Sequence, residues 1–226
     1  KKGKGTKKVL SAQEKAQRSQ IRSVRRMFGR LGFSRAASDG KEITFKNRTG
    51  EFDDIFISEN VMVLCEYTVG QPGTSHVAGK SFLFNQINSN QSDWVKFAVE
   101  AYPDVREIFN GSSYDHDDYR VCICYFSGQG VSDEIESQLK FVSFIDGTKF
   151  RYFEALAKTI FRTARWEFFK YLKLDYSEIG SQVTTSQTSI QPFPGYVLPE
   201  KFSSFPKGFK VVSFYADPNS LLAMSY

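Results

Sequence analysis

The segment from Gly50 to Thr68, with the sequence GEFDDIFISENVMVLCEYT, constrains the fold more than any other part of the chain. It contains two strand-like stretches joined by the short turn-forming sequence SEN, which predicts an antiparallel pair. Alternate side chains of Val61–Thr68 point to opposite faces of a sheet, and both sets are largely apolar. Such a strand is covered on both sides, so the sequence predicts an α/β protein in which helices flank the sheet.

Three carboxylates interrupt this apolar segment. Asp53 and Asp54 are adjacent on the first strand-like stretch, and Glu66 lies within the second. Because burial of an unpaired carboxylate is costly, we expect a cation or hydrogen-bond donors beside Glu66. The group predicts a divalent metal site for Mg²⁺ or Mn²⁺. Strand parity favours Asp53 over Asp54 as the ligand, and the other aspartate is expected to cap the strand or to contact an arginine.

Helices are predicted on both sides of this segment. Ser11 and Glu14 form a capping-box pattern before an apolar stripe, and Gly32 is a stop signal, so a helix is expected between them. Further elements are expected as strands at 42–46, 51–57, 61–68, 119–126 and 141–145, and as helices at 75–87, 92–101 and 148–172. The first three of these strands are expected to form an antiparallel meander.

Two helical positions place charged side chains on apolar stripes. Lys80 shares a stripe with Val77 and Phe84, so its ammonium either faces the sheet beside Glu66 or extends to solvent. In the first case it would orient the attacking water in phosphoester hydrolysis. Glu14 continues the stripe of the first helix, and either caps that helix or contributes to the metal site.

Basic residues are concentrated near the N-terminus. Half of the 30 Lys and Arg lie in the first fifty residues, while the net charge of the whole chain is only +5. Lys1–Lys8 is expected to be a solubilising tail, whereas the helical arginines form a footprint suited to DNA phosphates. The candidate contacts to nucleic acid are Arg18, Arg22, Arg25 and Arg26, together with His76 near the start of the next helix.

Composition places the chain among ordinary globular proteins. Its hydrophobic fraction is 41%, and no segment has the uninterrupted apolar length that a membrane helix needs. The basic N-terminus lacks the apolar core of a signal peptide, which predicts a cytoplasmic protein that does not enter a membrane. The three cysteines, Cys65, Cys122 and Cys124, lie in strand-like runs without metal-ligand spacing and are expected to be reduced core residues.

The chain is expected to consist of a main domain and a C-terminal extension. Residues 1–175 are predicted to form the main domain, and residues 176–192, which are rich in Ser, Thr and Gln, to form a linker. Residues 193–226 are too few to bury a core of their own, which indicates a packing extension or the start of a second, truncated domain. Besides DNA, the expected partners are a second copy in a homodimer or a domain C-terminal to Tyr226.

The sequence GEFD, followed after a turn by VLCEYT, is similar to the GEID and VEVK pattern of PD-(D/E)xK nucleases. The segment 11–126 thus resembles the restriction-endonuclease-like superfamily. The resemblance implies an αβββαβ core with a mixed sheet, a metal held by Asp53 or Asp54 with Glu66, and hydrolysis of DNA. Thr68 occupies the position of the family's lysine, and in members with such a substitution the following helix can supply the lysine, here Lys80. An inward Glu on the leading helix, here Glu14, is also similar to that family.

A second resemblance concerns the biological context. EFDDIFISENVMVLCEYT, with His76, Lys80 and the later FPGYVLPEKF and VVSFYADP, is similar to the N-terminal part of bacterial DGQHR-domain proteins, although the DGQHR motif itself does not occur in the chain. Those proteins are associated with DNA modification and phage defence. The two resemblances predict a metal-dependent endonuclease that hydrolyses DNA. The alternatives are an inactive nuclease-fold module that binds DNA and regulates a partner, and a protein-interaction module of a defence complex.

Overall fold

A computed structural model describes residues 11–38, 40–70, 74–175 and 179–180, without the side chains of residues 74–76 and 78. The chain separates into two units, 1–175 and 176–226, and every described helix and strand belongs to the first. The predicted extension at 193–226 and most of the predicted linker lie outside the described residues.

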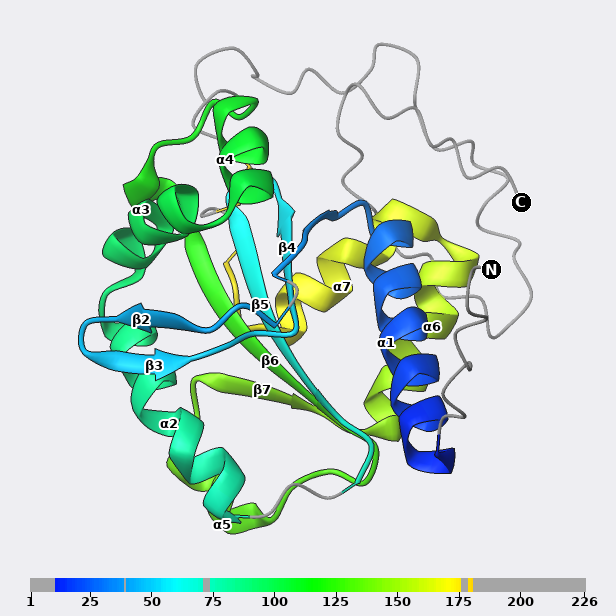
Figure 1. Ribbon diagram of the computed structural model, residues 1–226. Coiled ribbons are helices and arrows are strands. Elements are labelled where there is room, and N and C mark those ends of the chain that lie inside the picture. Colours follow the sequence, from blue (N-terminus) through cyan, green and yellow to red (C-terminus); the bar gives the residue numbers. More distant parts are fainter. Residues whose placement is uncertain (1–10, 39, 71–73, 176–178, 181–226) are drawn as a thin grey trace, which may run out of the picture. The chain divides into compact units, whose positions relative to one another are not determined.

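The described part of the first unit contains both strands and helices (Figure 1). The strands are β1 (Ser34–Ala36), β2 (Ile43–Phe45), β3 (Arg48–Gly50), β4 (Asp54–Ser58), β5 (Val61–Thr68), β6 (Arg120–Ser127) and β7 (Val142–Ile145). The α-helices are α1 (Ala12–Arg30), α2 (Thr74–Ser89), α3 (Gln91–Ala101), α4 (Pro103–Asn110), α5 (Asp133–Gln138), α6 (Gly147–Thr159) and α7 (Ala164–Tyr171). Two short 3-10 helices are η1 (His116–Asp118) and η2 (Phe161–Thr163). None of these helices is both long and apolar enough to cross a membrane.

The centre of the unit is a five-stranded mixed sheet with the strand order β1-β4-β5-β6-β7. β4 is antiparallel to both β1 and β5, while β6 is parallel to both β5 and β7. Every residue of the central strand β5 except Thr68 is buried, as expected for a strand covered on both faces. Helices flank the sheet in Figure 1, which confirms the predicted α/β class.

The two faces of the sheet carry separate apolar clusters. On one face, Leu64 of β5 belongs to a buried cluster with Phe84 of α2 and Trp94 of α3. On the other face, Phe56 of β4 stacks on Phe28 of α1 at a ring-centroid distance of 4.0 Å. Because successive side chains of a strand alternate between faces, β4 and β5 contribute to both clusters. α1 and α2 therefore cover opposite faces of the sheet.

The predicted strand at 42–46 is present as β2, but its predicted place in the meander is wrong. The sequence predicts a sheet strand at 42–46, but β2 pairs with β3 in a separate two-stranded hairpin. Lys46 and Asn47 have φ angles of 45° and 62°, the left-handed values that a two-residue hairpin turn requires. The edge strand of the main sheet is instead β1, whose three residues are too few to show an alternating pattern.

The last part of the unit contains two α-helices where the sequence predicts one. The segment 148–172 is divided into α6, η2 and α7. The break falls at Phe161, whose φ of 46° is left-handed and does not continue an α-helix. The predicted first helix, by contrast, has the expected capping box between Ser11 and Glu14 and a left-handed Gly32 after its end.

The three cysteines are free. Cys65 of β5 and Cys124 of β6 occupy paired positions on neighbouring parallel strands, and both are fully buried. Burial raises the pKa of both thiols well above the ordinary value, because the thiolate would lose its hydration. Both side chains therefore behave as core residues.

Candidate active site

Glu66, which is buried, and Lys80, which is partly buried, form a hydrogen-bonded pair on the sheet face that α2 covers. Lys80 Nζ donates a hydrogen bond to Glu66 Oε2. Of its two expected orientations, Lys80 adopts the inward one, on the same helix stripe as the buried Phe84 and Ile87. Glu66 is 3% exposed, and its second oxygen, Oε1, has no hydrogen-bond partner among the described residues. That buried oxygen can accept a further ligand.

Asp53 lies one residue before β4 and near Glu66 and Lys80. Its backbone N–H donates to the Cys65 carbonyl at 3.0 Å, and its Oδ2 accepts from the Tyr67 N–H at 2.8 Å. Cys65 is also the residue that Asp54 opposes, so the regular pairing of β4 with β5 ends at Asp54. The Asp53 carboxylate raises the pKa of Glu66, and the Lys80 ammonium lowers the pKa of Asp53, so the three groups lie near one another. The structure therefore brings Asp53 to the Glu66–Lys80 pair.

Burial dominates the electrostatics of these carboxyl groups. It raises the pKa of Glu66 to about 8, although the Lys80 ammonium acts in the opposite direction. The nearby Asp53 and Glu51 raise the pKa of Glu66 further. Burial likewise raises the pKa of Asp53, against the hydrogen bond that Asp53 accepts from the Tyr67 backbone. Two neighbouring carboxyl groups that resist ionisation would both be stabilised as anions by a bound cation.

The two carboxylates fit a hard divalent cation such as Mg²⁺ or Mn²⁺. Proteins commonly hold Mg²⁺ through one or two carboxylates, while water and phosphate oxygens complete its coordination. Across the described part of the chain, no group of three or more His, Cys, Asp and Glu side chains is arranged to hold a metal ion. A metal ion here would depend on Asp53, on Glu66 and on oxygens from outside the protein.

Asp54 faces the other side of the sheet and is tied to arginines. Its Oδ2 accepts from Arg25 Nε at 2.7 Å and from the Tyr67 hydroxyl at 2.9 Å, and its Oδ1 accepts from Arg35 Nε. The carboxylate is fully buried, so these donors replace its hydration. Asp54 therefore links α1 and the edge strand β1 to β4, and it is the aspartate that contacts an arginine.

One other residue predicted for the metal site is not brought to Asp53 and Glu66. Glu14 belongs to α1, on the opposite sheet face, where its Oε2 accepts from the Ser11 N–H at 2.7 Å. That backbone hydrogen bond lowers the pKa of Glu14. Of its two expected roles, Glu14 has that of the helix cap. The backbone of His76 lies in α2, and its side chain lies outside the description.

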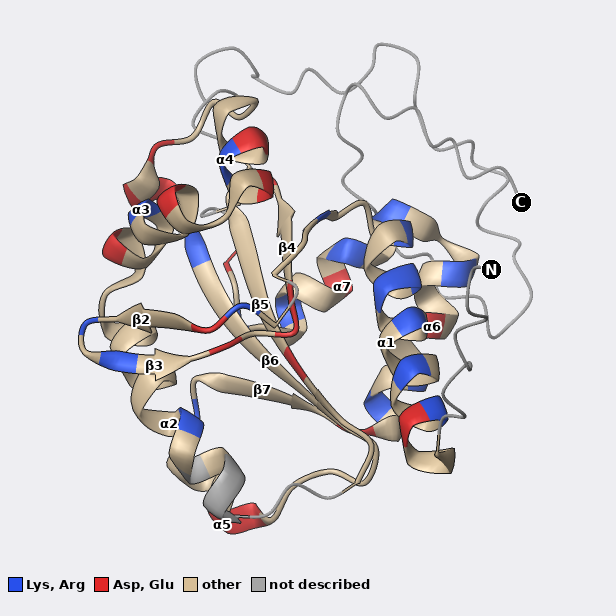
Figure 2. Cartoon of the chain, in the orientation of Figure 1, with Lys and Arg blue, Asp and Glu red and all other residues tan. Residues whose placement is uncertain are grey.

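Three of the four arginines expected to contact DNA form an exposed row on α1. Arg18, Arg22 and Arg26 are exposed, and we refer to them as the basic stripe. Arg25 instead forms the ion pair with Asp54. Figure 2 shows positive residues along α1 and on the neighbouring α6. Because α1 covers the face opposite α2, the basic stripe and the Glu66 carboxylate lie on different sides of the sheet.

Tyr125 and Arg35 are neighbours of these acids that sequence reasoning missed. Tyr125 of β6 pairs with Glu66, and its buried hydroxyl has no hydrogen-bond partner within the described residues. Its proximity depends on the register of two strands far apart in the sequence, for which the sequence carries no signal. Arg35 lies in β1, a strand too short to predict.

Comparisons with known proteins add no identification. No family model matches the chain, and neither a curated protein nor a solved structure is significantly similar to it. Function must therefore be argued from the geometry of the residues themselves.

The raised pKa of Glu66 predicts a pH dependence of stability in the metal-free protein. Between the ordinary pKa of 4.5 and about 8, the folded state keeps a proton on Glu66 that the unfolded chain has lost. Stability is therefore expected to fall as the pH rises through this window, by at most ~1.4 kcal/mol per pH unit from this group. Urea unfolding in EDTA across the window measures the slope. Glu66→Gln should reduce the slope of stability against pH. An unchanged slope in the variant would show that Glu66 is not the group that takes up the proton.

Proposed function

We propose that this chain is a metal-dependent nuclease that hydrolyses DNA phosphodiester bonds. The observation that carries the proposal is the Glu66–Lys80 pair beside Asp53, with Glu66 Oε1 lacking a partner among the described residues. Two carboxylates and a lysine on one face of a sheet are the groups that metal-assisted phosphoester hydrolysis uses.

The order of the elements supports the same proposal. Taken as α1, β1, β4, β5, α2 and β6, the chain follows the αβββαβ order that the family resemblance implies. The β2–β3 hairpin and the helices α3 and α4 are then additions to that core. Asp53 immediately precedes the second strand of this core and Glu66 lies in the third, in keeping with the GEFD and VLCEYT motifs.

Each residue has a separate task in this proposal. Asp53 and Glu66 would hold Mg²⁺ or Mn²⁺, which when bound supplies a Lewis acid and lowers the pKa of coordinated water. Lys80 is anchored by one hydrogen bond to Glu66 Oε2, and its other N–H groups can donate to an attacking water or to a phosphate oxygen. Lys80 would thereby take the place of the lysine that is absent at Thr68.

Incubation of supercoiled plasmid with the full chain tests the proposal. Reactions contain Mg²⁺, Mn²⁺ or EDTA, and gels separate supercoiled, nicked, linear and protein-bound plasmid. Cleavage that requires the divalent metal supports the nuclease. Binding without cleavage supports the second candidate below, and the absence of both supports a protein-interaction module in a bacterial defence complex.

The second candidate is a DNA-binding module that does not cleave, and the basic stripe favours it. Arg18, Arg22 and Arg26 project from one helix into solvent, where they can neutralise successive phosphates. Such a module would use the face of α1 and would not need Lys80. It would regulate a partner by recruiting it to DNA.

Replacement of the whole basic stripe by glutamine is expected to weaken DNA binding under either function. Loss of three phosphate contacts should reduce the slope of log K against log salt concentration by up to about 3. Fluorescence anisotropy of a labelled duplex at several salt concentrations measures both the affinity for DNA and its dependence on salt. A variant with Lys96→Gln and Lys140→Gln, two exposed lysines outside α1, is the control. Equal slopes for the stripe variant and wild type would show that α1 does not contact DNA.

A further inference from the structure

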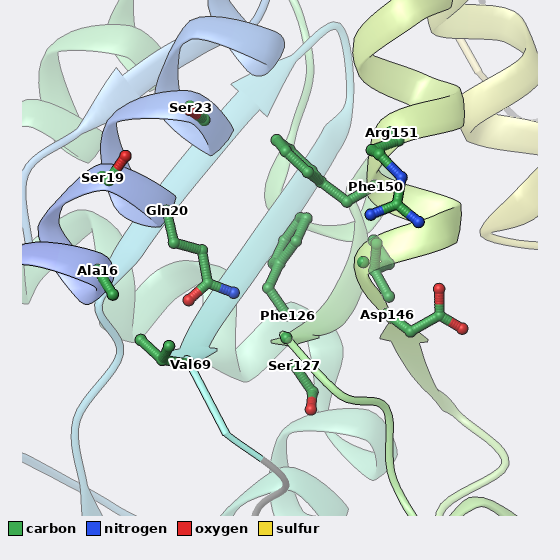
Figure 3. A pocket seen from close by; sticks show the side chains of 13 residues that line it. Ala16, Ser19, Gln20, Ser23, Val69, Phe126, Ser127, Asp146, Phe150 and Arg151 are labelled. Carbon is green, nitrogen blue, oxygen red and sulfur yellow. The ribbon is translucent and has the colours of Figure 1, made fainter. Parts of the chain in front are cut away.

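Tyr125 of β6 is buried beside Glu66, and the roles proposed above leave it without a task. The parallel strands β5 and β6 pair Glu66 with Tyr125, and paired side chains on neighbouring strands point to the same face of a sheet. Phe126, the next residue of β6, points to the other face. Figure 3 shows its ring between α1 and α6, where it lines a cavity of about 390 Å³ with Gln20. Tyr125 and Glu66 therefore share the face that α2 covers.

Two buried polar atoms on this face lack a hydrogen-bond partner within the described residues. They are the Tyr125 hydroxyl and Glu66 Oε1, since Lys80 donates only to Oε2. Buried hydroxyl and carboxyl oxygens are nearly always hydrogen-bonded, because an unpaired one loses its hydration without compensation. The two atoms do not bond to each other. A small polar group held between them would satisfy both.

The other neighbours of Tyr125 direct attention to the same side. On β7 the residue paired with Tyr125 is Phe144, whose ring has no hydrogen-bonding group and lies 5.9 Å from the Tyr125 ring between centroids. Burial raises the pKa of Tyr125, and the charges of Glu66 and Asp53 raise it further, because they would repel a phenolate. The hydroxyl thus keeps its proton and lies in the field of both carboxylates that the proposed function uses.

Tyr102 shows that an unpaired hydroxyl does not by itself indicate a site. Tyr102 follows α3, is 1% exposed and belongs to the same apolar cluster as Tyr125. Its hydroxyl also has no partner in the described part of the chain. Burial alone raises the pKa of Tyr102, without a contribution from a carboxylate. What distinguishes Tyr125 is its place beside Glu66 and Asp53, and Tyr102 is its matched control.

We propose that Tyr125 is a further residue of the candidate active site, and that its hydroxyl forms a hydrogen bond with an oxygen atom held at Glu66 Oε1. The oxygen belongs either to a water molecule bound there or to a phosphate group of DNA. Water would donate to the Tyr125 hydroxyl oxygen, whereas a phosphate oxygen would accept from the Tyr125 O–H. In both cases Tyr125 orients the group that Glu66 binds, and this role rests on the proposed metal site.

Two measurements on the full chain test the role of Tyr125. Electron paramagnetic resonance of free Mn²⁺ gives the Mn²⁺ affinity without DNA, and plasmid cleavage in Mn²⁺ gives the rate. Tyr125→Phe is expected to lower the affinity or the rate about tenfold or more, the usual effect of losing a group that orients a metal ligand. The variant keeps the ring and removes no hydrogen bond to a described residue, so it should fold, which its urea midpoint checks. Tyr102→Phe should match wild type in both measurements.

The outcomes separate the source of the oxygen and the fate of each proposal. A lower Mn²⁺ affinity without DNA assigns the oxygen to water, and slower cleavage at an unchanged affinity assigns it to a DNA phosphate. The role of Tyr125 is overturned if Tyr125→Phe matches wild type in both measurements, or if Tyr102→Phe is impaired equally. A wild type that binds Mn²⁺ without cleaving contradicts the nuclease alone, and the Mn²⁺ affinities of the two variants then decide the role of Tyr125. A wild type that does neither overturns both proposals.

Discussion

Glu66→Gln protein is expected to cleave plasmid DNA at least about 100-fold more slowly than wild type in Mg²⁺. The substitution keeps the size of the side chain but removes the negative charge that a divalent cation needs, and Asp53 is left as a lone ligand. The variant should still fold, because burial already disfavours the charged form of Glu66 and raises its pKa to about 8. The first-order rate at which supercoiled plasmid disappears measures the effect.

Lys80→Met is the partner substitution, with an expected loss on the order of 100-fold. Methionine retains the apolar stem of the side chain but cannot donate a hydrogen bond to water or phosphate. Lys96→Met, which changes an exposed lysine on α3, is the matched control and should cleave at the wild-type rate. A wild-type rate in Lys80→Met would remove Lys80 from the reaction. Wild-type rates in both Lys80→Met and Glu66→Gln would place the active site elsewhere.

Asp54→Asn is expected to produce the largest loss of stability, about 3 kcal/mol in the free energy of unfolding. The fully buried carboxylate accepts from Arg25, Arg35 and the Tyr67 hydroxyl, and an amide removes the negative charge with which both guanidinium groups pair. The Arg25 and Arg35 side chains are 39% and 32% exposed, so they regain some hydration, which limits the loss.

Urea unfolding measures the Asp54→Asn effect as a shift of the midpoint. Asp93→Asn is the matched control, because Asp93 also pairs with a basic side chain, Lys46 at 2.6 Å, but both partners are exposed. Exposed ion pairs contribute little, so its midpoint should move much less. Equal midpoints for Asp54→Asn and wild type would show that the arginine contacts do not stabilise the fold.

Local patterns were sufficient to predict much of the sheet. The alternation in Val61–Thr68 predicted a strand buried on both faces, and β5 has that burial. The same period of two separates Asp53 from Asp54, and the structure places them on opposite faces. The cap at Ser11 also depends on residues within one turn, which explains why it could be predicted.

Relations between distant segments could not be predicted. An amphipathic stripe shows that a helix packs on a sheet but not which face it covers. One of the two roles expected for Glu14 placed it at the metal site near Lys80, whereas α1 and α2 cover opposite faces and Glu14 has its other expected role, the helix cap. The pairing of Tyr125 with Glu66 depends on a parallel register that no local pattern specifies. The cavity around Gln20 is likewise assembled from segments far apart in the chain.

The paired cysteines of β5 and β6 provide a built-in report of whether a variant is folded. Cys65 and Cys124 are inaccessible in the native sheet, and burial raises the pKa of both thiols, so neither presents a reactive thiolate to an alkylating reagent. Separation of β5 from β6 would expose both at once. Alkylation of Cys65 and Cys124, counted apart from that of the partly exposed Cys122, can therefore distinguish a variant that has lost only its chemistry from one whose sheet has opened, without any added label.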